Sequence, residues 1–201
     1  ESVTYNGVNY VVTSIEAGAF YDCVDLTSVT IPSNVTEIGN SAFEGCSGLT
    51  SLEIPNGVTF IGTDAFTGTA WLDNQPEGLL YIGKVVYKYI GTMPENTSIS
   101  LKEGTTAIVG KAFHECSGLI SIDIPNTVTS IGMGAFTYCS NLTSVIIPQG
   151  VTSIGTSAFN SCYSLASVSI PNSVTSIGSG SFYKCKALTE IVIPNSVIEI
   201  G

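Results

Sequence analysis

The stretch LTSVTIPSNVTEIGNSAFEGCSG, residues 26–48, decides the fold because the chain repeats it with little change. Later copies read LTSVIIPQGVTSIGTSAFNSCYS at 142–164 and LASVSIPNSVTSIGSGSFYKCKA at 165–187. The same phase places phenylalanine at Phe20, Phe43, Phe66, Phe113, Phe136, Phe159 and Phe182. Successive members lie one repeat apart, except that the interval from Phe66 to Phe113 holds two repeats and one extra residue. A fixed period of this length is typical of a solenoid built from stacked repeats.

Within one repeat, the apolar spacing indicates a strand, a second extended segment and a tight turn. Val29 and Ile31 alternate with polar residues, as in a short strand, and Pro32 ends it. A second extended segment is expected at 35–38, and the i, i+3 spacing of Phe43 and Cys46 predicts one helical or 3₁₀ turn. Because a single repeat leaves its apolar face open, the coils must stack with their strands paired in parallel. The predicted fold class is therefore a β-rich repeat solenoid with a parallel sheet.

The composition excludes several classes of protein. Hydrophobic residues make up 44% and charged residues 11%, so the chain is neither disordered nor a coiled coil. Sixteen acidic residues against six basic ones give a formal charge of −10, which argues against a nucleic-acid partner. No apolar run reaches the roughly 18 residues of a membrane helix, so the chain is not expected to be membrane-embedded.

The repeat resembles a known family. Leu26, Val29, Ile31 and Asn34 are similar to the strand signature of leucine-rich repeats. The rest of the unit closely resembles the BspA-like (Treponema pallidum-type) leucine-rich repeats. One copy shows this with Ile147-Pro148, Val151-Thr152, Ile154-Gly155, Ala158-Phe159 and Cys162. The resemblance implies a right-handed leucine-rich-repeat solenoid, a secreted or cell-surface location in a bacterial-type protein, and adhesion to host or partner macromolecules.

The period also divides the chain into sections. We expect one solenoid over 1–201, with a partial unit at 1–25, two repeats at 26–71, an atypical unit at 72–95, four repeats at 96–187 and a truncated repeat at 188–201. Strand-like runs at 79–82 and 85–90, joined by Gly83 and Lys84, predict a β-hairpin in the atypical unit. Near the start, Asn6 and Gly7 indicate a turn. The truncated last repeat is typical of a monomeric fragment of a longer array.

The outward positions of the main strands form a candidate binding face. Stacked in register, they make a flat, hydroxyl-rich surface with a few carboxylates, and extended solenoid faces commonly bind partners. Its residues are Thr27, Ser28, Thr30, Thr50, Ser51, Glu53, Ser121, Asp123, Thr143, Ser144, Ser167 and Ser169. The alternative interpretation is that serine and threonine are simply soluble strand formers at exposed positions.

The atypical unit supplies a second candidate site. It carries an aromatic set, Trp71, Tyr81, Tyr87 and Tyr89, that suits contact with a partner. The alternative is a bulkier coil with a projecting hairpin and no contact role.

The cysteines are expected on the buried side of the turn, three residues after each phenylalanine except Phe66, where Thr69 stands. They are Cys23, Cys46, Cys116, Cys139, Cys162 and Cys185. Packed free thiols are the first interpretation, with disulfides between staggered coils as an alternative. Metal binding is disfavoured because zinc sites need paired cysteines or added histidines.

No catalytic, cofactor-binding or metal-ligating residue is expected. The single histidine, His114, occupies a variable slot that is expected to be exposed, and Glu115 is expected to point elsewhere. The carboxylates are scattered, and the glycines lack the sequence of a phosphate-binding loop. The leading hypothesis is therefore a non-enzymatic extracellular module that binds a protein or glycan. A structural spacer without a ligand is the alternative, and an enzyme would need a pocket near Trp71–Tyr89.

Overall fold

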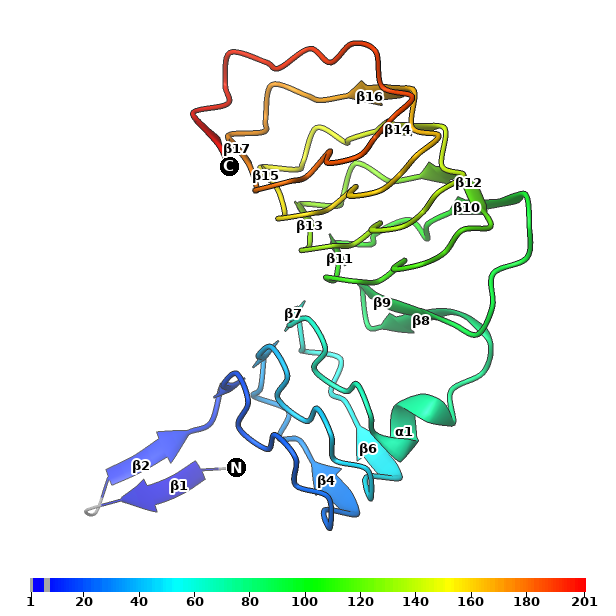
Figure 1. Cartoon of the computed structure of the whole chain (residues 1–201). Coiled ribbons are helices and arrows are strands. Elements are labelled where there is room, and N and C mark those ends of the chain that lie inside the picture. Colours follow the sequence, from blue (N-terminus) through cyan, green and yellow to red (C-terminus); the bar gives the residue numbers. More distant parts are fainter. Residues whose placement is uncertain (1, 6–7) are drawn as a thin grey trace. The chain divides into compact units, whose positions relative to one another are not determined.

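The computed structural model describes residues 2–5 and 8–201, with side chains from residue 11 onward. The turn predicted at Asn6 and Gly7 lies outside the described residues. The chain forms two compact units, residues 1–76 and 77–201, here called unit 1 and unit 2. Each unit contains its own stack of coils (Figure 1).

Unit 1 begins with a hairpin and continues as stacked coils. Strands β1 (Ser2–Tyr5) and β2 (Val8–Val11) pair antiparallel. The coils contribute a parallel sheet of β3 (Ser14–Ile15), β5 (Glu37–Ile38) and β7 (Phe60–Ile61), and a second parallel pair of β4 (Ser28–Thr30) and β6 (Ser51–Glu53). Ile15 pairs with Ile38 and Ile38 with Ile61, so the register advances by one full repeat at each coil.

The helix α1 (Ala70–Asp73) follows the last phenylalanine of unit 1. Thr69 stands where other coils have cysteine. Its hydroxyl donates to the carbonyl of Phe66 at 2.8 Å and accepts from the amide of Leu72 at 3.1 Å. The second of these bonds is an N-cap, so Thr69 starts a helix where the other coils continue into a strand.

Unit 2 opens with an antiparallel hairpin of β8 (Gly78–Ile82) and β9 (Val85–Ile90), which confirms the hairpin predicted from the sequence. Strand β9 then starts a parallel ladder with β11 (Ala107–Ile108), β13 (Ser130–Ile131), β15 (Ser153–Ile154), β17 (Ser176–Ile177) and β18 (Glu199–Ile200). The longer strands pair separately, as β10 (Thr97–Ser100) with β12 (Leu119–Asp123) and β14 (Ser144–Ile146) with β16 (Ser167–Ser169).

The core of each unit is a column of phenylalanine rings. In unit 1 the rings of Phe20 and Phe43 stack with centroids 5.1 Å apart. In unit 2 the ring of Phe136 stacks on both Phe113 and Phe159 at 5.1 Å, within 4° of parallel. Parallel strands are about 4.8 Å apart, so one coil supplies one ring. The predicted fold class, a β-rich solenoid with parallel strands and one coil per repeat, is confirmed.

The turn that carries each phenylalanine differs from the predicted helical or 3₁₀ turn. Ser41 and Gly45 have φ of 54° and 78°, in the left-handed region, which interrupts a helix. Ala42 and Glu44 donate back three residues within the coil, whereas the amide of Phe43 donates to Ala65 in the next coil. The segment is therefore a run of β-turns. Alternate amides donate to the next coil, so they are not available for the hydrogen bonds of a helix.

Glycine follows every ladder isoleucine except Ile15 and Ile108, and a close approach of two backbones favours it there. A Cβ on Gly62 would lie 2.2 Å from the amide nitrogen of Asn40, and one on Gly155 would lie 2.6 Å from the carbonyl carbon of Gly132. Neither neighbour is the flexible end of a side chain, so the coils would have to separate.

The one helix in the described part of the chain is four residues long, and none there has the length and apolar character needed to cross a membrane.

Candidate functional site

The main strands place short polar side chains outward and apolar ones inward. In unit 1, Ser28 pairs with Ser51 and Thr30 with Glu53, on either side of the inward pair Val29 and Leu52. In unit 2, Ser144 pairs with Ser167 in the same alternation. Side chains in a strand alternate between faces, and this alternation produces the hydroxyl-rich surface.

The structure exposes nearly the whole predicted face. Eleven of its twelve residues are exposed and Ser121 is half-buried; the Ser121 hydroxyl donates to that of Ser98 at 2.8 Å. The set divides between the units. Thr27, Ser28, Thr30, Thr50, Ser51 and Glu53 lie in unit 1, and Ser121, Asp123, Thr143, Ser144, Ser167 and Ser169 lie in unit 2. Each half is therefore described as a separate surface.

A groove of about 430 Å³ crosses the unit 2 half of this face. It runs over β10, β12 and β14, and its lining includes Asp123, Ser144 and Ile146. Here β12 pairs with β10 and β14 pairs with β16, and the coils of β12 and β14 are joined by the Thr143 amide, which donates to the Ile120 carbonyl at 3.2 Å. Ile146 is 72% exposed beside these hydroxyls, so the groove offers hydrogen-bonding groups, one carboxylate and one apolar surface.

Sequence reasoning missed part of this groove. Ser98, Ser100 and Asn126 also line it but were not among the candidate residues. The coil at 96–118 is degenerate, with Asn96 in the leucine position, so its outward residues were overlooked. Ile99 holds the inward position of this strand, and side chains alternate along a strand. The sequence therefore predicts that Ser98 and Ser100 face outward.

The aromatic candidates do not form one described surface. Tyr87 is buried, with 3% of its side chain exposed, and belongs to the core, which removes it as a contact residue. Tyr81 has Lys102 Nζ 4.3 Å from its ring centroid, and its hydroxyl accepts from the Lys102 amide. Trp71 lies in unit 1, edge-on to Phe66 at 5.2 Å, and half-buried Tyr89 lies in unit 2. Tyr89 also packs against the core of unit 2, so all four residues take part in packing within their own unit.

The cysteines are free thiols in the structure, with Cys23 exposed and the other five buried. Each of four thiols donates to the phenylalanine carbonyl of the preceding coil, as Cys139 does to Phe113 at 3.0 Å and Cys162 to Phe136 at 3.1 Å. Burial raises the pKa of the Cys116 and Cys162 thiols to about 12 and that of Cys185 to about 11. The thiol is therefore a protonated hydrogen-bond donor and a poor nucleophile at neutral pH.

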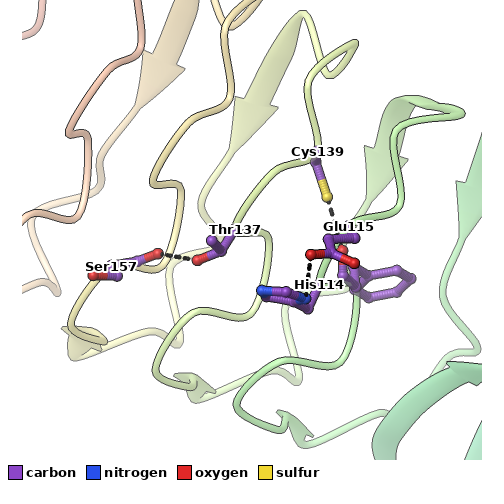
Figure 2. A network of polar contacts seen from close by, with 6 residues as sticks. His114, Glu115, Thr137, Cys139 and Ser157 are labelled. Carbon is purple, nitrogen blue, oxygen red and sulfur yellow. Dashed lines mark hydrogen bonds and ion pairs between the residues drawn. The ribbon is translucent and has the colours of Figure 1, made fainter.

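The surroundings of His114 differ from the sequence expectation in one respect. Glu115 was expected to point elsewhere, yet its Oε1 lies 3.8 Å from His114 Nδ1 (Figure 2). Glu115 has φ of 61°, and this left-handed turn places the neighbouring side chains together. The nearby Thr137 hydroxyl donates to the Ser157 carbonyl at 2.7 Å, so it is already engaged (Figure 2).

Within residues 2–5 and 8–201, no group of three or more His, Cys, Asp or Glu side chains is arranged to hold a metal ion.

The repeat geometry is that of a known family. A family model described as the BspA type leucine rich repeat region matches residues 13–93 and 81–201, in six copies. The chain belongs to the BspA-type leucine-rich repeat family. No curated protein matches this BspA-type chain.

Three solved structures show similarity to this chain. A leucine-rich repeat protein from Bacteroides ovatus is 31% identical over all of this chain, with a TM-score of 0.52. The BspA-type chain spans 51% of the length of that protein. A T. pallidum leucine rich repeat protein is 28% identical, over 92% of this chain and 75% of its own, with a TM-score of 0.43. A leucine rich cell surface protein from Faecalibacterium prausnitzii is 20% identical, over 99% and 85%, with a TM-score of 0.48.

Proposed function

We propose that this BspA-type chain is a non-enzymatic binding and adhesion module that recognises a protein or glycan through its hydroxyl-rich strand face. The observation that carries the proposal is the groove over β10, β12 and β14 in unit 2. Its serine hydroxyls both donate and accept hydrogen bonds and lose little side-chain entropy when a partner orders them. Asp123 adds one negative charge and Ile146 an apolar contact.

The same groove supports binding in preference to catalysis. Its lining contains one carboxylate and no histidine, lysine or cysteine, so it lacks the acid–base or nucleophile–base pair that hydrolysis requires. We also propose an extracellular or cell-surface location, on the strength of the family to which the repeats belong.

The test uses variants that copy neighbouring coils. Ser100 and Ser169 occupy the positions of Asp123 and Ile146 in other coils, so Asp123→Ser with Ile146→Ser removes the charge and the apolar contact while keeping a side chain the fold accepts. Glu190→Ser with Ile198→Ser is the matched control, since both residues are exposed and outside the groove.

The full chain would be screened on a glycan array and on purified matrix proteins. We expect a reproducible ligand whose affinity falls at least about tenfold in the groove variant, equivalent to roughly 1.4 kcal/mol, and is unchanged in the control. A folded chain that finds no ligand, or a ligand indifferent to the groove variant, would contradict the proposal and favour the spacer role.

A further inference from the structure

Two tyrosines and two lysines gather on successive turns of unit 2, away from the groove. This cluster consists of Tyr163, Tyr183, Lys184 and Lys186. Tyr163 and Lys186 are one repeat apart and so occupy the same position of adjacent coils. The Ala187 amide donates to the Tyr163 carbonyl at 3.2 Å, and the Ser161 amide donates to the Tyr183 carbonyl at 2.8 Å. These bonds hold the two turns side by side.

The side chains of this cluster face solvent, and each lysine contacts one tyrosine ring. Lys186 Nζ lies 5.1 Å from the ring centroid of Tyr163, and Lys184 Nζ lies 5.2 Å from that of Tyr183. Tyr183 is 58% exposed and Tyr163 37%, and both lysines are exposed. Each ammonium is thus held near an aromatic ring while remaining accessible to a ligand.

The charges around the cluster set it apart from the rest of the chain. The segment 124–189 contains no Asp or Glu, and Lys184 and Lys186 are its only charged residues. No ion pair to a carboxylate is found for either lysine within the described residues. On a chain with a formal charge of −10, these two turns form a local cationic surface whose charge is not neutralised by a neighbour.

Lys184 occupies a backbone position that successive coils fill with different residues. Its φ is 59°, in the left-handed region, and the same position of other coils is held by Asp22, Gly45, Gly68, Glu115, Tyr138 and Ser161. Because the coil accepts glycine there, the fold does not require a lysine at this position.

From these observations we propose that the cluster binds an anionic sugar, one that carries a carboxylate or a sulfate. Tyrosine rings offer flat surfaces for the C–H face of a sugar, and the two ammonium groups attract its charged substituent. The hydroxyls of Tyr163 and Tyr183 can bond its ring oxygens. This site goes beyond the proposed strand-face function, because it lies outside the groove and selects ligands of the opposite charge to those that Asp123 would attract.

An acidic peptide and a nucleic acid suit the cluster less well. A peptide would need backbone hydrogen bonds from a strand edge or groove, whereas the carbonyls of Tyr163 and Tyr183 already accept from the adjacent coil and the Tyr183 amide donates to Gly180 within its own turn. A nucleic acid presents many phosphates, and two lysines neutralise few of them on a chain of net negative charge.

The experiment measures binding of the full chain to an immobilised sialylated trisaccharide, a sulfated disaccharide and a neutral counterpart, at about 50 and about 300 mM sodium chloride. The variant Lys184→Gly with Lys186→Ser removes both charges and adopts residues that other coils carry at these positions, Gly45 and Ser140. Tyr163→Ser with Tyr183→Asn removes both rings in the same way, following Ser140 and Asn160. Lys84→Ser with Lys88→Ser is the control with an equal change of net charge.

We expect binding to one or both anionic sugars and not to the neutral one, with affinity that weakens as salt rises. The two sugars separate a carboxylate ligand from a sulfate ligand. The lysine and tyrosine variants should each lose at least about fivefold in affinity, and the control less than about twofold.

The proposal is overturned if the folded chain binds neither anionic sugar, or if the control loses as much as the lysine variant. It is also overturned if the tyrosine variant binds normally, or if a polyglutamate peptide or a single-stranded oligonucleotide binds more tightly than the sugars. Loss of sugar binding here with intact groove binding would leave the strand-face function standing, because the two variant sets share no residue.

Discussion

The two units share an interior and differ in their surfaces. Both contain stacked phenylalanines and a ladder to which each coil contributes one isoleucine. Residues 1–76 nevertheless contain nine Asp or Glu and no Lys or Arg, whereas residues 77–201 contain seven acids and all six lysines. Five of the six lysines are exposed, and none belongs to the repeated core. The residues that stack between coils are thus the same in both units, because each coil must pack on the next. The outward residues make no such contact and can differ in charge and in what they bind.

The largest expected effect comes from removing a ring of the shared interior. Phe43→Ala in unit 1 and Phe136→Ala in unit 2 should each lower the free energy of unfolding by about 3–5 kcal/mol, since both rings are fully buried and stacked. Urea titration followed by circular dichroism measures this. Phe60, which is 52% exposed on β7, provides the control, and a comparable loss in Phe60→Ala would refute the column as the source of stability.

A smaller effect is expected from the close backbone approach. Gly62→Ala and Gly155→Ala should each cost about 1–3 kcal/mol, because the added methyl would overlap the backbone of the adjacent coil in either unit. The same urea titration applies, with Ser176→Ala as the matched exchange that adds no atom against a neighbouring backbone. Normal stability in both glycine variants would mean that the coils are not held at this spacing.

The strand period, the fold class and the hairpin could all be predicted from the sequence, because each depends on apolar spacing within about one repeat. The turn around Phe43 could not, since its left-handed residues Ser41 and Gly45 are stabilised by bonds to the next coil. The exposed face was predicted from alternation alone. The groove was not, because residues of β10, β12 and β14 line it together, which depends on how three coils stack and on no single repeat.

High pH should distinguish the units. Burial raises the pKa of Cys116 and Cys162 to about 12, whereas the same group in an unfolded chain titrates near 9. Above pH 9 the unfolded state loses thiol protons that the folded state keeps, so stability is full below pH 9 and falls until the folded pKa is reached. At pH 10 the fully buried thiol of Cys162 alone should lower the free energy of unfolding by roughly 1 kcal/mol.

The effect should be greater in unit 2, which holds four buried cysteines, than in unit 1, which holds Cys46 alone. Trp71 is the single tryptophan, and its fluorescence reports on unit 1, while circular dichroism reports on both units. Replacing Cys162 with serine keeps a donor for the Phe136 carbonyl and should remove part of the pH dependence. An unchanged pH profile in that variant would show that the thiol does not contribute.

The smallest predicted effect concerns salt. Unit 1 carries acidic groups without a cation of its own, so screening should relieve repulsion there. Raising sodium chloride to about 0.3 M should stabilise unit 1 by about 0.5 kcal/mol, detected as a shift of the Trp71 fluorescence transition to higher urea. If salt shifts the Trp71 transition equally in Glu53→Gln and in the unmodified chain, the Glu53 carboxylate does not contribute to the repulsion in unit 1.

The central claim, that each coil places its phenylalanine directly on the ring of the preceding coil, is tested most directly by nuclear Overhauser contacts in a chain with labelled phenylalanines. The account predicts ring-to-ring contacts from Phe136 to both Phe113 and Phe159, and from Phe43 to Phe20, at the 5.1 Å centroid spacing of these pairs. Rings that show no such contacts in a folded chain, or contacts that skip a coil, would contradict it.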